Sequence, residues 1–151
     1  MPLNNPSFRA GDTILPSRFV TMVPTGILTA ADYTVFPSVA TTSFILGVSQ
    51  DGTKFPEATD GFGAGAQTVA AAVGDQIRVY GSGDVCLLEV NNAGSTITAG
   101  TLLTATTAGV GVVVATGAGI KFVGAVALET PPAIDGALIR VQVVQLEVSA
   151  A

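Results

Sequence analysis

Carboxylates are the side chains of this sequence that could most readily do chemistry, because the chain has no histidine and a single cysteine. Asp51, Glu57 and Asp60 form the densest acidic set. Neighbouring carboxylates can act as the acid and base of a glycosidase or bind calcium. Each of these three stands beside Gly, Pro or Thr, where acidic residues usually serve turns and solubility, and the spaced oxygen ligands of a calcium loop are missing. We therefore predict solvated loop carboxylates here and no metal site.

Other catalytic motifs lack the residues that they need. Without histidine the chain has no Ser-His-Asp triad, no Cys-His pair and no Cys/His zinc site. Cys86 lies within the apolar run 85–90, which predicts a buried and unreactive thiol. The glycine-rich stretch 61–66 has no strong strand before it and no long helix after it, unlike a phosphate-binding turn. We predict that the protein is not an enzyme and has no catalytic residue, cofactor or metal; a carboxylate-based hydrolase stays open as an alternative.

Short apolar segments separated by Gly and Pro indicate β-strands along the chain. We predict an all-β fold, a compact β-barrel or β-sandwich. The glycines of residues 81–84 suit a hairpin turn, so the strands at 77–80 and 85–90 are predicted to pair with each other. In the last strand, 137–148, the apolar phase slips by one residue at Val143–Val144, which predicts a β-bulge there.

The first twelve residues differ from the rest of the chain. They contain two prolines, two asparagines and no apolar periodicity, so we predict an extended N-terminal arm at 1–12 and a single β domain at 13–151. The Gly, Pro and Asp-Gly content of 50–66 predicts a long loop or exposed hairpin within that domain. A weak internal similarity suggests two related β units, 13–90 and 91–151. Chance similarity between Val/Ala/Gly/Thr strands explains it equally well.

The composition predicts a protein that buries apolar surface against other molecules. Of its residues 48% are hydrophobic and only 11% are charged, and the net charge is −5. Because the six basic residues are scattered singly, we expect no nucleic-acid partner. The chain does not begin like a signal peptide, and no apolar stretch reaches the ~18 residues of a membrane span, so we expect no membrane partner. Other copies of the chain or another protein are the remaining partners.

Adjacent aromatic and cationic side chains suggest where such contacts lie. Phe8 and Arg9 stand side by side in the predicted arm, and Arg18 and Phe19 stand side by side at the start of the first strands. Aromatic residues and arginine are enriched where one protein anchors on another. With Leu3 as a further apolar anchor in the arm, these residues are our predicted contacts with a partner. The alternative is a mobile terminus and a salt-bridged start to the first strand.

Three segments of the second half resemble a known family. Residues 97–103 read ITAGTLL, residues 122–127 read FVGAVA after a valine strand, and residues 138–143 read LIRVQV after a Pro/Ala/Asp-Gly turn. In this order and spacing they resemble the small capsid cement, or head decoration, proteins of tailed bacteriophages, most clearly over 74–146. The resemblance implies a virion structural protein, made in the host cytoplasm, that docks on the outer capsid surface, usually as a homotrimer. There it would clamp neighbouring capsomers of the major capsid protein.

Under this resemblance Leu3, Phe8, Arg9, Arg18 and Phe19 are expected to contact the capsid or a neighbouring subunit. The family contributes no catalytic residues. The long segment 50–66 departs from the compact pattern of the family, which leaves the strand count and the outer surface open. A carbohydrate-binding or host-surface adhesion module on the virion is the alternative function, although 6% aromatic residues and no Trp supply few platforms for stacking sugars.

Overall fold

The computed structural model describes residues 8–22, 33–38, 44–49 and 70–150. Within these residues the secondary structure is β apart from one short 3-10 turn, η1 (Thr107–Gly109), which confirms the predicted all-β fold. Two predicted features lie outside the described residues: Leu3, and the glycine-rich segment 50–66 with its carboxylates Asp51, Glu57 and Asp60.

The first six strands form one sheet with the order β5-β1-β3-β2-β4-β6. Its neighbours are antiparallel except for β1 and β3, which run parallel. The sheet packs over its own apolar cluster, in which Ile14, Val20 and Val35 are fully buried. The strands are β1 (Phe8–Ala10), β2 (Phe19–Thr21), β3 (Thr34–Pro37), β4 (Gly47–Ser49), β5 (Gln76–Ile77) and β6 (Val79–Tyr80).

The remaining five strands close into a barrel with the order β10-β11-β7-β9-β8. Alternating side chains line its interior, because successive residues of a strand point to opposite faces. Along β7, Cys86, Leu88 and Val90 are buried, so the predicted buried thiol is confirmed. The strands are β7 (Val85–Asn91), β8 (Leu102–Ala105), β9 (Gly111–Val113), β10 (Gly119–Ala127) and β11 (Asp135–Ala150).

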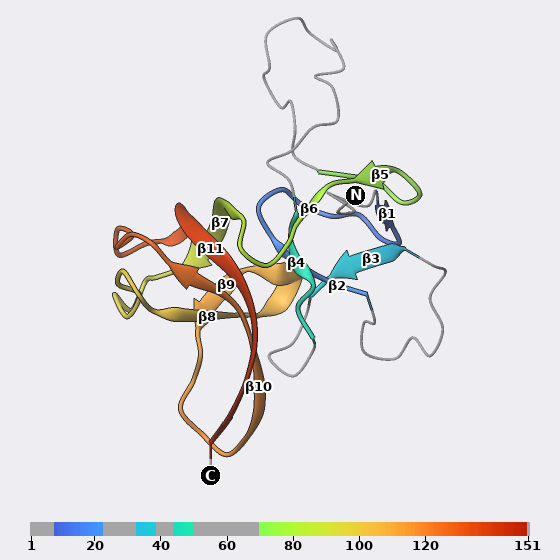
Figure 1. Cartoon of the computed structure of the whole chain (residues 1–151). Coiled ribbons are helices and arrows are strands. Elements are labelled where there is room, and N and C mark those ends of the chain that lie inside the picture. The colour runs from blue at the N-terminus through green and yellow to red at the C-terminus, as the bar shows by residue number, and fades with distance from the viewer. Residues whose placement is uncertain (1–7, 23–32, 39–43, 50–69, 151) are drawn as a thin grey trace, which may run out of the picture.

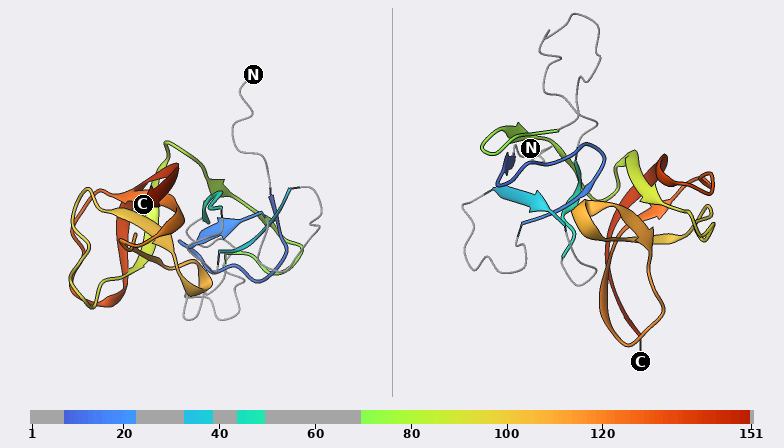
Figure 2. Two further views of the ribbon diagram at one scale, coloured as in Figure 1. Left: turned by 90° about the horizontal axis from the view of Figure 1, so that it is seen from below. Right: turned by 180° about the vertical axis from the view of Figure 1, so that it is seen from behind.

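The sheet and the barrel lie side by side and share a core (Figures 1 and 2). Phe19, Ile45 and Val48 from the sheet side are buried in the same cluster as the barrel interior. Gly124 of β10 makes this contact possible, because a Cβ atom there would lie 2.6 Å from Phe19 Cε1 and 2.8 Å from Ile45 Cγ2. Because residue 124 of β10 has no side chain, the sheet can dock against the barrel at this position.

The predicted hairpin between residues 77–80 and 85–90 is wrong. The turn itself forms, since the Gly81 amide donates to Asp84 Oδ2 at 2.9 Å and the Asp84 amide donates to the Gly81 carbonyl at 3.0 Å. However, β6 pairs with β4, and β7 pairs with β11 and β9. The turn carries the chain from one core to the other, and Gly83 and Asp84 are anchored by backbone hydrogen bonds to Val143. The change from sheet to barrel thus falls at 81–84, before the suggested unit boundary at 90/91.

The predicted bulge in the last strand is confirmed. The β10–β11 ladder pairs Val123 with Leu146 and then Ala125 with Val143, so Val144 and Gln145 together oppose Gly124. The buried phase of β11 runs through Val143 and ends at this bulge. Beyond it, residues 119–123 and 146–150 continue as a two-stranded extension that projects from the barrel toward the C-terminus (Figure 1). We call this extension the ribbon.

Candidate interaction surface

Both predicted aromatic contacts, Phe8 and Phe19, are core residues. Phe8 lies in β1, faces Ile77 of β5 across the ladder and is only 8% exposed. Phe19 is fully buried between the sheet and the barrel. The prediction that these two residues contact a partner is therefore corrected. Both rings are already removed from water by packing against other apolar residues of the same chain, which is favourable.

The predicted arm ends earlier than residue 12. Phe8–Ala10 form β1, which is held between β3 and β5, so this part of the segment is an inner strand of the sheet. The strand could not be recognised locally because its partners, Thr34–Val35 and Gln76–Ile77, are distant in sequence. Arg9 is the one predicted contact residue among those described whose side chain is exposed, since β1 turns it away from the core.

Arg18 joins the sheet to the barrel. Its Nη2 donates to Glu89 Oε2 of β7 at 2.8 Å, and its Nη1 donates to the Ala108 carbonyl at 3.2 Å. Only 11% of the Arg18 side chain is exposed, and 27% of the Glu89 side chain. Arg18 is therefore an internal clamp, and its predicted role as a contact residue is corrected. The alternative of a salt-bridged start to the first strand describes it better.

The ribbon and its neighbour Phe44 carry some of the exposed apolar side chains of the described residues, while others, such as Val85 and Leu138, lie on the barrel wall. Ile120 is 52% exposed and Leu146 is 49% exposed, and beside them Phe44 is 48% exposed. The rings of Phe44 and Phe122 meet edge to face, with centroids 5.9 Å apart at 82°. Ile120 is two residues from Phe122 along β10 and so points to the same side. Leu146 opposes Val123 in the ladder and so points to the other side of the ribbon. We call Phe44, Ile120, Phe122 and Leu146, which flank both faces of the ribbon, the ribbon patch.

Three members of the ribbon patch, Phe44, Phe122 and Leu146, help to line a groove of about 250 Å³ together with Gln145. The bulge builds this groove, because the extra residue in β11 directs Gln145 toward the segment before β4, where its Nε2 donates to the Leu46 carbonyl at 2.6 Å. That bond holds Phe44 against the ribbon. The signal available in the sequence was the phase slip at Val143–Val144, which marks where β11 leaves the barrel.

No family model and no curated protein matches the chain.

The chemistry of the patch suits adhesion between surfaces. Glu147, opposite Phe122 in the ladder, supplies the carboxylate of the groove. In the part of the chain that the structure describes, no group of three His, Cys, Asp or Glu side chains could hold a metal ion. Across the same residues, no helix has the length and apolar character of a membrane crossing. What the ribbon offers is an apolar, partly aromatic surface with polar groups at its rim, which is the usual make-up of a protein interface.

Proposed function

We propose that this chain is a virion structural protein that binds the outer surface of a phage capsid and cements neighbouring capsomers. The observation that carries the proposal is the ribbon patch, because Ile120 and Leu146 expose apolar side chains on a ribbon that projects from the barrel toward the C-terminus (Figure 1). The low charged fraction of 11% supports the same proposal, since a freely diffusing protein usually carries more charge. The resemblance of residues 74–146 to capsid cement proteins supports the major capsid protein as the partner.

The proposed mechanism is thermodynamic linkage between binding of this protein and assembly of the shell. A protein that binds the assembled shell and not its separated subunits stabilises the shell by mass action. Burying Ile120 or Leu146 contributes roughly 1.5–3 kcal/mol each before the costs of association are subtracted. We propose that the protein acts as a homotrimer. Once one patch of a trimer is bound, the other two bind at a high effective concentration, so a modest net binding free energy for each patch gives tight attachment.

Co-sedimentation with undecorated, expanded capsids tests the proposal. I120D and L146D each place a charge in the ribbon patch and should reduce capsid affinity by about tenfold or more. L138D is the matched control, because Leu138 is 56% exposed on the same strand, opposite Glu89 on the barrel wall. It should bind like the wild type. Analytical ultracentrifugation of the same samples should show a species of three times the monomer mass.

Each contrary outcome has a definite meaning. A wild-type protein that fails to sediment with capsids contradicts the cementing function. Equal losses for L138D and the two ribbon variants would mean that the ribbon patch is not the capsid-binding surface. Binding to immobilised glycans in the absence of capsid binding would favour the alternative, a carbohydrate-binding or adhesion module.

A further inference from the structure

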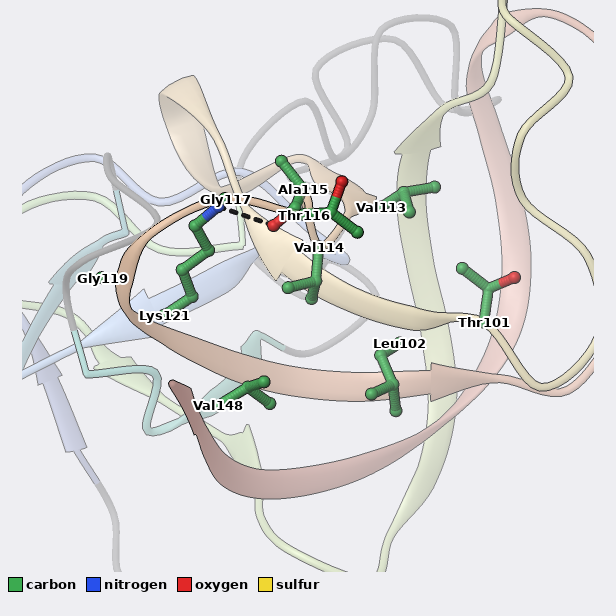
Figure 3. A pocket seen from close by; sticks show the side chains of 10 residues that line it. All are labelled: Thr101, Leu102, Val113, Val114, Ala115, Thr116, Gly117, Gly119, Lys121 and Val148. Carbon is green, nitrogen blue, oxygen red and sulfur yellow. Dashed lines mark hydrogen bonds between the residues drawn. The ribbon is translucent and has the colours of Figure 1, made fainter. Parts of the chain in front are cut away.

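A second cavity lies on the barrel side of the ribbon, between the ribbon and the segment that joins β9 to β10 (Figure 3). It has a volume of about 290 Å³. Its walls are the side chains of Leu102, Val113, Val114 and Val148, which come from β8, β9, the following segment and β11. These walls are apolar, and concave apolar sites with a few well-placed polar groups are the usual form of small-molecule sites.

The charged group among the residues that line this cavity is a cation, beside the hydroxyls of Thr101 and Thr116. Lys121 of β10 projects across it, and its Nζ donates to the Ala115 carbonyl at 2.6 Å (Figure 3). An ammonium group has three donors, so two remain for another acceptor. The residue is half-buried with its bond to Ala115 open to solvent, and among the described residues no carboxylate lies within ion-pair distance of it. Glu147 cannot reach it across the ladder, because Glu147 opposes Phe122 and therefore points to the other face of the ribbon.

The charge and shape of the cavity together define its ligand. A half-buried cation without an acidic partner favours an anion, and the apolar walls favour an alkyl chain. A volume of 290 Å³ holds about ten non-hydrogen atoms at roughly 30 Å³ each, the share of a water molecule in the liquid. A carboxylate on a chain of that size would place its oxygens at Lys121 and its methylene groups among Leu102, Val113, Val114 and Val148.

We propose that this cavity binds a medium-chain alkyl carboxylate, with Lys121 holding the carboxylate. The site is separate from the groove of the ribbon patch, and the proposal does not rest on the cementing function. Octanoate is the probe, because its size matches the cavity. We expect a dissociation constant on the order of 1 mM, since small ligands gain limited free energy per atom.

Titration of the full chain with octanoate, followed by methyl and amide NMR, tests the proposal. Saturable shifts are expected at Val113, Val114, Lys121 and Val148. Octanamide, the neutral isostere, should bind about tenfold more weakly, and so should octanoate to K121Q, because both changes remove the charge-assisted bond. R140Q is the matched control: Arg140 is the other cation of the barrel, is 70% exposed and lies beside Glu129, so its loss should leave binding unchanged.

A second variant guards against a change in the local fold. V148F fills the cavity from β11 while keeping Lys121, and it should abolish the saturable shifts. Equal affinities for octanoate and octanamide, or wild-type octanoate affinity in K121Q, would overturn the assignment of Lys121. Shifts that do not saturate, or that appear mainly at exposed Ile134 and Leu138 of the barrel, would show non-specific association and overturn the site.

Discussion

Gly124 is the residue on which the contact between the two parts of the molecule depends most closely. It lies in the middle of β10, where glycine weakens a strand, and it is buried. The reason for it is space, since Phe19 and Ile45 occupy the volume that its side chain would need. Glycine at position 124 is unfavourable for a strand, but it leaves room for Phe19 and Ile45. Packing therefore overrides the local strand preference here.

The substitution G124A should therefore destabilise the protein by about 1–3 kcal/mol through overpacking. G81A is the matched control, because a Cβ at Gly81 meets no atom within 4 Å. It should change the free energy of unfolding by less than about 0.5 kcal/mol. Urea unfolding followed by circular dichroism measures both. A G124A protein as stable as G81A would mean that Phe19 and Ile45 can move aside without cost.

At the scale of elements, regular alternation was the part of the fold that could be read from the sequence. The periods of β7 and β11 identify inward-facing residues, and the phase slip at Val143 locates the bulge. Pairing between distant segments could not be read in this way. β1 pairs with β5 across more than sixty residues of sequence, and the 81–84 turn joins strands that do not pair.

The candidate surface was missed for a related reason. Phe44 and Phe122 are distant in sequence and meet in the fold, where Gln145 of the bulge bonds to the nearby Leu46 carbonyl. Their adjacency is a consequence of tertiary structure, whereas neighbours such as Arg18 and Phe19 attract attention in the sequence although both serve internal packing. Aromatic and cationic neighbours in sequence are thus a weak guide to exposed contacts in this fold.

The ribbon should open more readily than the barrel. A two-stranded ribbon is marginally stable in water, and beyond the bulge β10 and β11 pair only with each other among the described strands. At low protein concentration, amide protons of residues 120–122 should exchange on the order of 100-fold faster than those of Leu88 and Val90 in β7. Hydrogen exchange read by NMR measures the ratio. Equal protection in the monomer would contradict the prediction, while protection that rises with concentration would place the ribbon in a contact between copies.

For the molecule as a whole, the question is whether the sheet and the barrel unfold together. They share the cluster around Phe19, and the Arg18–Glu89 pair bridges them at 2.8 Å. The chain carries its own probes: Tyr80 lies in β6 of the sheet and packs against the shared cluster, and the thiol of Cys86 lies in β7 of the barrel. Because Phe19, Ile45 and Val48 from the sheet side are part of the barrel's core, we expect a single cooperative transition.

The Arg18 clamp tests this expectation. R18M keeps much of the apolar stem but leaves the Glu89 carboxylate without its partner, so it should lower the free energy of unfolding by about 2 kcal/mol. E89Q and the double variant complete a cycle whose coupling energy should be about 1 kcal/mol. In urea, tyrosine fluorescence and Cys86 labelling should give coincident curves in the wild type and shift together in R18M. A labelling curve that stays in place while the fluorescence curve shifts would mean that the barrel folds without the sheet, and that Arg18 stabilises the sheet alone.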